Sequence, residues 1–418
     1  MRTLLLQPDL VSEMGRRPAS DALDEGISLA SALGDIDLVG SQVVPLREPK
    51  AGMFFGRGKL DEIADLISDG GIGLVLINAA ITPIQQRNLE RHWKVKILDR
   101  TGLILEIFGA RARTREGVLQ VELAALNYQK TRLVRSWTHL ERQRGGLGFV
   151  GGAGETQIEA DRRAINDAIV RLKRQLSKVV KTRELHRSAR RKVPYPIVSL
   201  VGYTNAGKST LFNKMTGADV MSKDMVFATL DPTMRSVTLS NGTDVILSDT
   251  VGFISDLPTT LVAAFRATLE EVLEADLILH VRDIAHHETD RQRRDVIDVL
   301  RELGISEEAT VPIIEVWNKI DLLDADGITT TRNIAARDNQ VVRVSAVTGE
   351  GLDELTDAIT TRLAPALTDA VVLLSHMEGQ RRAWLFENTD VVKEDVTEQG
   401  IELHVRWSDA QAARFEKV

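Results

Sequence analysis

The sequence IVSLVGYTNAGKS, residues 197–209, decides the fold of the segment around it. Its first five residues form an apolar run typical of a buried strand, and a glycine-bounded loop follows directly. Glycine lets the backbone N–H groups of such a loop turn inward around phosphates at the N-terminus of the next helix. Lys208 is then expected to neutralise the β- and γ-phosphate oxygens, and the Ser209 hydroxyl to ligate Mg²⁺. The predicted phosphate-binding residues are Gly202, Tyr203, Thr204, Asn205, Ala206, Gly207, Lys208 and Ser209.

A second motif selects the base. The apolar run Ile313–Trp317 predicts another buried strand, and Asn318-Lys319-Ile320-Asp321 stands at its end. The carboxylate of Asp321 can accept hydrogen bonds from both N1–H and the exocyclic amine of guanine, whereas adenine offers no such pair of donors. Asn318 is expected to brace the surrounding loops, and Lys319 to lie along the base. The motif therefore favours GTP over ATP.

Two further segments supply the metal and γ-phosphate contacts. The strand Val245–Ser248 ends in Asp249-Thr250-Val251-Gly252. Its carboxylate can hold a water on Mg²⁺, and its glycine N–H can face the γ-phosphate. The segment Phe227-Ala228-Thr229-Leu230-Asp231 offers Thr229 as the second protein ligand of Mg²⁺, with Thr233 as the alternative.

A fifth element closes the predicted site. Ser345-Ala346-Val347, after the strand Val341–Val344, can supply backbone N–H groups to guanine O6. All five elements occur in chain order within one domain-sized stretch, which predicts hydrolysis of Mg-GTP to GDP and phosphate. The groups expected to act on the reacting phosphate are Lys208, Thr229 and Gly252, and the expected metal ligands are Ser209 and Thr229.

Two positions bear on the rate of hydrolysis. In GTPases that orient the attacking water with glutamine, that residue follows the glycine of the Asp-x-x-Gly motif, and Phe253 stands there in this chain. Because a phenyl ring cannot orient water, slow intrinsic hydrolysis that depends on a partner is expected. The place of Asn205 in the phosphate loop resembles that of the asparagine in potassium-activated GTPases, so a K⁺ ion near the phosphates is a further hypothesis.

The whole chain is expected to contain four parts. Residues 1–115 alternate strand and helix patterns and predict a small parallel α/β domain, and residues 116–192 predict an antiparallel helical hairpin with a glycine-rich loop. Residues 193–365 form the predicted α/β P-loop domain, a mostly parallel sheet with helices on both faces. Residues 366–418 read as a small α+β module of strand 370–374, helix 378–387 and strand 401–405.

The predicted hairpin is strongly basic. Residues 130–192 hold seventeen Lys and Arg against six Asp and Glu, although the whole chain carries a formal net charge of −7. Such a one-sided excess favours contact with a polyanion, whereas the alternative is a solvated coiled coil whose charges confer only solubility.

Composition limits the remaining possibilities. The chain has no cysteine, which excludes disulfides and thiolate metal sites, and its first ten residues hold too short an apolar run for a signal peptide or a membrane span. A monomeric cytoplasmic protein is expected, with peripheral membrane contact through the basic hairpin left open.

Several motifs outside the nucleotide site resemble the HflX family of translational GTPases. They are the glycine-rich stretch 145–149, the block Gly154-Glu155-Thr156-Gln157-Ile158-Glu159, the segment Phe55–Lys59 and the segment Leu119–Leu123. The block beginning at Gly154 is specific, because it is not a general GTPase feature.

This resemblance implies a nucleotide-dependent binder of the large (50S) ribosomal subunit and its rRNA, which splits or rescues stalled ribosomes or serves ribosome biogenesis. The alternative is an rRNA-binding assembly factor whose GTP state only times its docking and release. The glycine-rich tip at residues 145–154 suits close approach to RNA. A second nucleotide loop that takes ATP is the alternative for this stretch.

Overall fold

The structure is a computed structural model of all 418 residues. It describes residues 1–10, 17–143, 153–190, 195–218, 226–227, 233–255, 272–305, 311–364, 367–397 and 400–416. The contacts divide the chain into two units, Met1–Ala358 and Ile359–Val418.

The chain begins with a four-stranded parallel sheet in the order β2-β1-β3-β4. Its strands and helices are β1 (Arg2–Leu10), α1 (Ala19–Ser31), β2 (Asp37–Leu46), α2 (Arg57–Gly70), β3 (Leu74–Ile77), α3 (Pro83–Trp93), β4 (Lys96–Asp99) and α4 (Arg100–Arg111). The predicted parallel α/β fold is therefore confirmed. The sequence pattern did not predict α4, because eight of its twelve residues are buried and its apolar run lacks the helical spacing of a half-exposed helix.

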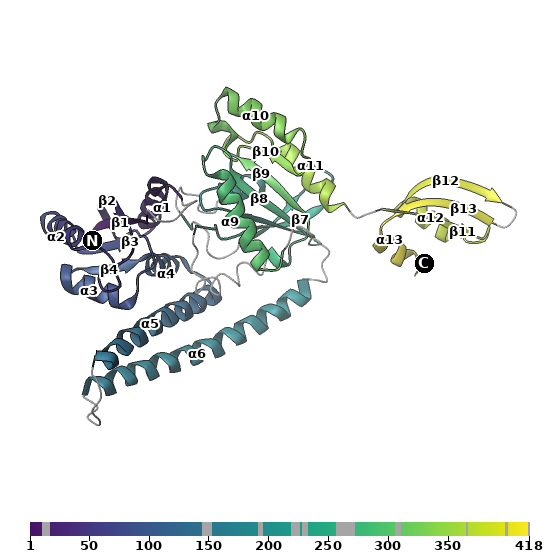
Figure 1. Ribbon diagram of the computed structural model, residues 1–418. Helices are drawn as coiled ribbons and strands as arrows, with labels where there is room; N and C mark the ends of the chain where they lie inside the picture. Colours follow the sequence, from purple (N-terminus) through teal and green to yellow (C-terminus); the bar gives the residue numbers. More distant parts are fainter. Residues whose placement is uncertain are drawn as a thin grey trace. The chain divides into compact units, whose positions relative to one another are not determined.

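Two long helices follow, α5 (Arg115–Gln143) and α6 (Ala153–Arg190), and they lie side by side (Figure 1). Polar contacts fix α5 to the first sheet. The Tyr128 hydroxyl donates to Asp99, the carboxylate of Asp99 pairs with Arg132 at 2.5 Å, and the Arg132 guanidinium lies 4.2 Å from the centre of the Tyr128 ring. Residues 145–152, the main part of the predicted glycine-rich loop, lie outside the described residues.

The second sheet has six strands in the order β10-β9-β8-β5-β7-β6, and all neighbours are parallel except β6 and β7. Because the carboxyl ends of its parallel strands share one edge, the predicted loops meet there. The elements are β5 (Ile197–Gly202), α7 (Lys208–Thr216), β6 (Thr233–Thr238), β7 (Asp244–Asp249), β8 (Leu277–Asp283), α9 (Thr289–Glu302), β9 (Ile313–Asn318), the 3₁₀ turn η1 (Ile320–Leu322), α10 (Ala325–Ala335), β10 (Val341–Arg343) and α11 (Leu352–Leu363).

One continuous hydrophobic core joins these two sheets. Leu29 and Phe108 from the first part pack with Phe227, Phe253 and Ile254 from the second. The Phe108 and Phe227 rings meet edge to face with their centres 4.8 Å apart. The segments around the predicted nucleotide site are thus partly buried against the first α/β part.

The second unit is a three-stranded antiparallel sheet in the order β11-β13-β12, with α12 (Gly379–Asn388) and α13 (Asp409–Phe415). Its strands are β11 (Thr368–Leu374), β12 (Asp390–Thr397) and β13 (Gly400–Trp407). The sequence pattern predicted β11, α12 and β13 but not β12 or α13. In β12 no residue is buried and charged side chains interrupt the apolar alternation, so no strand period is visible.

No helix among the described residues is long and apolar enough to cross a membrane.

Candidate functional site

The phosphate loop follows β5 and requires glycine at both ends. Gly202 and Gly207 adopt φ angles of +153° and +94°. A Cβ atom at Gly202 would lie 2.2 Å from the Val281 carbonyl oxygen, and one at Gly207 would lie 2.1 Å from Asn318 Nδ2. Between them Asn205 adopts φ +61°, a left-handed conformation that asparagine tolerates better than most residues. The positive φ angles, together with the close approach of Val281 and Asn318, therefore explain the two glycines.

Lys208 begins α7 and is buried. Its ammonium donates to the carbonyl oxygens of Gly202, at 3.0 Å, and Tyr203, at 2.8 Å. Burial lowers the pKa of Lys208 to about 8, while the charge of Asp249 acts in the opposite direction. The two carbonyls thus hold the ammonium against the phosphate loop. An anionic ligand bound there would raise the pKa of Lys208 again.

The side chains of Ser209 and Asp249 are in contact with each other. The Ser209 hydroxyl donates to Asp249 Oδ2 at 2.7 Å, and Asp249 is fully buried at the end of β7. Thr250 is fixed next to it, because its hydroxyl donates to the Leu200 carbonyl at 2.5 Å. A hydroxyl and a carboxylate are the hard oxygen donors that Mg²⁺ prefers.

The structure does not test the predicted second Mg²⁺ ligand. Ala228, Thr229, Leu230 and Asp231 lie outside the described residues, and only Phe227 of that motif is described, with its side chain buried. Thr233, the alternative ligand, begins β6 and is paired with Asp249 in the strand register.

The segment after Asp249 lies directly on the phosphate loop. Phe253 N–H donates to the Gly202 carbonyl at 3.1 Å, and Thr204 N–H donates to the Phe253 carbonyl at 2.7 Å. A Cβ at Gly252 would lie 2.8 Å from Thr204 Cα and 2.9 Å from Lys208 Nζ, so only glycine fits. Val251 and the Phe253 side chain are buried in the core shared with the first sheet.

Asn318 joins three of the predicted elements. Its side-chain amide donates to the Ala206 carbonyl at 2.8 Å, and its amide oxygen accepts from Ala346 N–H at 2.9 Å. The structure therefore brings the phosphate loop, the 318–321 motif and the 345–347 motif together. Ser345 is fully buried and Val347 is exposed, as is Asp321, which lies in the turn η1 together with the buried Ile320.

Asp283 is a site residue that the sequence reasoning missed. It ends β8, and its carboxylate pairs with the Lys319 ammonium at 2.7 Å. Lys319 itself adopts φ +64°, and this conformation directs the start of η1. The available signal was an acidic residue shortly after the apolar run 277–279, a run for which no strand was predicted.

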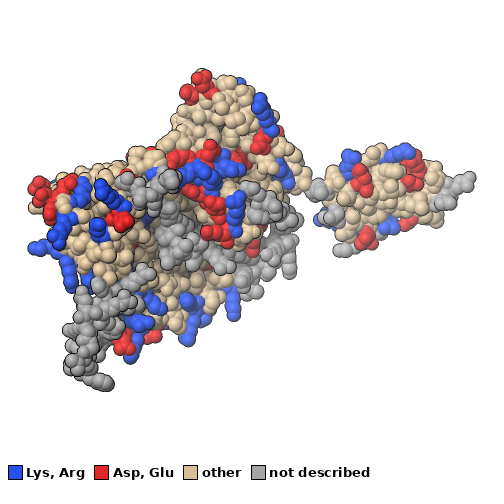
Figure 2. Space-filling view, in the orientation of Figure 1, with Lys and Arg blue, Asp and Glu red and all other residues tan. Residues whose placement is uncertain are grey.

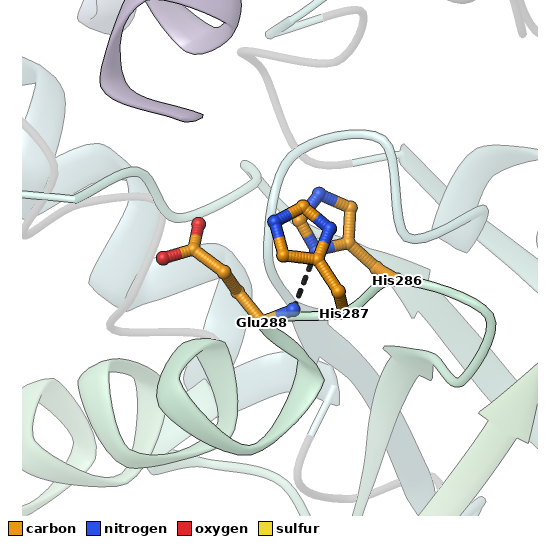
Figure 3. Close-up of side chains that lie close together, drawn as sticks. All are labelled: His286, His287 and Glu288. Carbon is orange, nitrogen blue, oxygen red and sulfur yellow. Dashed lines mark hydrogen bonds between the residues drawn. The ribbon is translucent and has the colours of Figure 1, made fainter. Parts of the chain in front are cut away.

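A cluster of potential metal ligands lies at the start of α9. Ligand atoms of His286, His287 and Glu288 lie within 4.8 Å of one another, and the two imidazole rings stack with centres 4.6 Å apart. The carboxylate of Glu288 extends away from both rings (Figure 3). It pairs with Arg17 Nε at 2.7 Å, while His287 Nε2 lies 2.9 Å from Asp21. We therefore interpret this cluster as ion pairs with the region around α1 and not as a metal site.

A mostly parallel six-stranded sheet whose strand ends carry these loops defines a P-loop GTPase. Four family models match the chain in succession. They are the GTP-binding GTPase N-terminal model at residues 20–109, the GTP-binding GTPase middle region at 111–190, the 50S ribosome-binding GTPase model at 197–319 and the HflX C-terminal domain at 330–418. The chain belongs to the HflX family of GTPases.

Curated relatives agree with this assignment over nearly the full length. The GTPase HflX of Magnetococcus marinus is 48% identical over 96% of this chain and 92% of its own. The GTPase HflX of Escherichia coli is 45% identical over 92% of this chain and 89% of its own. A solved structure of SsGBP in complex with GDP has the same fold, with a TM-score of 0.51, 24% identity, and coverage of 86% of this chain and 98% of the solved one.

Proposed function

We propose that this GTPase binds Mg-GTP with the five predicted sequence elements and uses hydrolysis to control its association with the large ribosomal subunit. The observation that carries the nucleotide site is the double hydrogen bond of Asn318, which joins the phosphate loop to the predicted guanine loops. Each predicted contact with the base, the phosphates or the metal remains part of this proposal.

In this proposal the residues act as follows. Lys208 binds the β- and γ-phosphate oxygens, Gly252 N–H meets the γ-phosphate, and Asp321 recognises guanine. Ser209 would ligate Mg²⁺ directly, and Asp249, whose Oδ2 lies 2.7 Å from the Ser209 hydroxyl, would hold a water on the ion, with Thr229 as the proposed second protein ligand. When bound, Mg²⁺ would neutralise charge that develops on the phosphates.

The proposed site contains no side chain at position 253 that could orient water. The Phe253 ring is buried in the shared core, so a slow intrinsic rate that the ribosome stimulates is part of the proposal. A K⁺ ion held with help from Asn205 is a second proposed source of stimulation. Asn205 lies in the middle of the phosphate loop and has a left-handed backbone conformation.

Charge on the hairpin supports the ribosomal partner. Along α6 the structure exposes a row of cations, which Figure 2 shows in part, and fewer acidic residues. The exposed cations of this row are Arg162, Arg163, Arg171, Lys173, Arg174, Lys178 and Lys181. Contacts from Lys and Arg to phosphates dominate affinity for RNA, and the family model over residues 197–319 is that of 50S ribosome-binding GTPases. We therefore propose rRNA of the large subunit as the partner, which implies a cytoplasmic location.

The proposed activity on ribosomes is splitting or rescue of stalled particles. The second candidate is an assembly factor that docks on rRNA without splitting, because the same basic hairpin would serve both. Sedimentation of intact ribosomes with the protein and a non-hydrolysable GTP analogue separates them. Free subunits are expected if the chain splits ribosomes. Co-sedimentation with intact ribosomes, without free subunits, would favour the docking factor, and absence of any binding would contradict both.

A further inference from the structure

A buried carboxylate of the first α/β part contacts the segment that follows Gly252. Glu25 lies on α1 and is 8% exposed. Its Oε1 accepts from Ser255 N–H at 3.2 Å, and its Oε2 accepts from the Ser255 hydroxyl. The Tyr203 hydroxyl, from the phosphate loop, also donates to Oε1 at 3.2 Å. One side chain thus binds both the loop and the segment that lies on it.

Two arginines neutralise this carboxylate. Arg17 and Arg100 both pair with Glu25, and Arg100 also donates to the Ser255 carbonyl at 2.7 Å. Although burial raises the pKa of Glu25, the charges of Arg100 and Arg17 and the Ser255 hydroxyl bring it below its usual value. The carboxylate therefore stays ionised and keeps accepting all of these hydrogen bonds.

Arg100 is itself held in place by hydrogen bonds to the first sheet. Arg100 donates to Asn78 Oδ1 at 2.7 Å, and the Asn78 amide donates to Gln7 Oε1 at 2.6 Å. These residues lie at the carboxyl ends of parallel strands β1, β3 and β4, the edge at which α/β sheets commonly bind ligands. In this protein Ser255 lies at that edge. A rigid sheet therefore fixes Ser255, which is three residues beyond Gly252.

We propose that Glu25 is a positioning residue for GTP hydrolysis: through Ser255 it fixes the segment Gly252–Ser255 on the phosphate loop, so that the Gly252 N–H is ready to meet the γ-phosphate. The inference rests on the proposed role of Gly252. Backbone bonds hold Phe253 at one end of the segment and the Glu25 network holds Ser255 at the other. A segment fixed at both ends loses less entropy when the γ-phosphate binds, so the contact favours GTP and its transition state over GDP.

The test compares the full chain with Glu25→Gln, which removes the charge with little change of volume. The expected result is about a tenfold lower kcat and a matching loss of affinity for a non-hydrolysable GTP analogue, with affinity for GDP unchanged. Asp24→Asn, on the same helix but exposed, is the matched control and should retain parental values for all three. A purely structural role would weaken GDP binding as well, and that outcome would overturn the inference, as would unchanged or increased turnover.

Ser255→Ala keeps the inference testable if Glu25→Gln does not fold, because the Glu25 ion pairs remain. It removes one of the two bonds from Ser255 to the carboxylate, so a smaller loss in the same direction is expected, again without loss of GDP affinity. Where both variants fold, the double variant should be no worse than Glu25→Gln alone, since both act through one contact. Additive losses would overturn the inference. Failure of the proposed function is distinguishable, because the parental chain itself would then not hydrolyse GTP.

Discussion

Replacing Asn318 with alanine tests the two side-chain hydrogen bonds that connect the loops of the nucleotide site. The substitution leaves the Ala206 carbonyl and the Ala346 N–H without their partner, and both residues are at most 3% exposed. A buried polar group without its hydrogen bond costs about 1–3 kcal/mol, so the two together cost about 2–6 kcal/mol. In the free protein the loops can relax and recover part of this cost, but nucleotide binding must close them again.

We therefore expect Asn318→Ala to weaken the binding of GTP and GDP alike. The lower end of the range, about 2 kcal/mol, corresponds to about a thirtyfold loss of affinity. Isothermal calorimetry with each nucleotide measures it. The control is Asn388→Ala, an exposed asparagine whose amide donates to the Trp384 carbonyl within its own helix, and it should leave both affinities unchanged. If Asn318→Ala binds both nucleotides like the parent chain, or loses GTP affinity alone, the bracing role is wrong.

Four further predictions follow from the same structure. Asp321→Asn should move base preference from guanosine toward xanthosine triphosphate, measured by competition binding, and retained preference for GTP would contradict the guanine contact. Burial lowers the pKa of His280 from its ordinary value of 6.5 to about 3. Between pH 6.5 and pH 3 the unfolded chain therefore binds a proton at His280 that the folded chain does not bind. Stability should therefore fall as pH falls through this window, and His280→Gln should flatten the dependence in denaturant titrations; an unchanged slope would exclude His280 as the cause. Changing Arg171, Lys173, Arg174 and Lys178 to glutamine should weaken binding to the large subunit and reduce its salt dependence with GTP affinity intact, and an unaltered salt slope would remove α6 from the interface. Turnover should be faster in potassium than in sodium at matched ionic strength, and equal rates would exclude the proposed role of Asn205.

The nucleotide loops could be predicted because local chemistry dictates them. A side chain would clash with the Val281 backbone at Gly202, with the Asn318 side chain at Gly207, and with Thr204 and Lys208 at Gly252, so these glycines identify the conformation. Asn318 was likewise expected to brace the loops, and the structure brings it to Ala206 and Ala346.

The contacts between the two sheets could not be predicted in the same way. Glu25 and Ser255 are separated by 230 residues, and nothing in the local pattern of α1 distinguishes Glu25 from the exposed Asp24 beside it. Phe253 illustrates the same limit. The sequence shows that position 253 lacks glutamine, but only the packing shows that the ring belongs to a core shared with Phe108. Long-range partners depend on how the two sheets pack, which no short motif encodes.

The junction between β4 and α4 attaches two different segments to the first sheet. Asp99 binds Tyr128 and Arg132 of the hairpin, while its neighbour Arg100 binds Ser255 beside the phosphate loop. A single peptide bond therefore separates the attachment of the proposed RNA-binding hairpin from that of the segment proposed to meet the γ-phosphate. A hairpin transplanted from a relative would therefore need side chains at the places of Tyr128 and Arg132 that can bind Asp99.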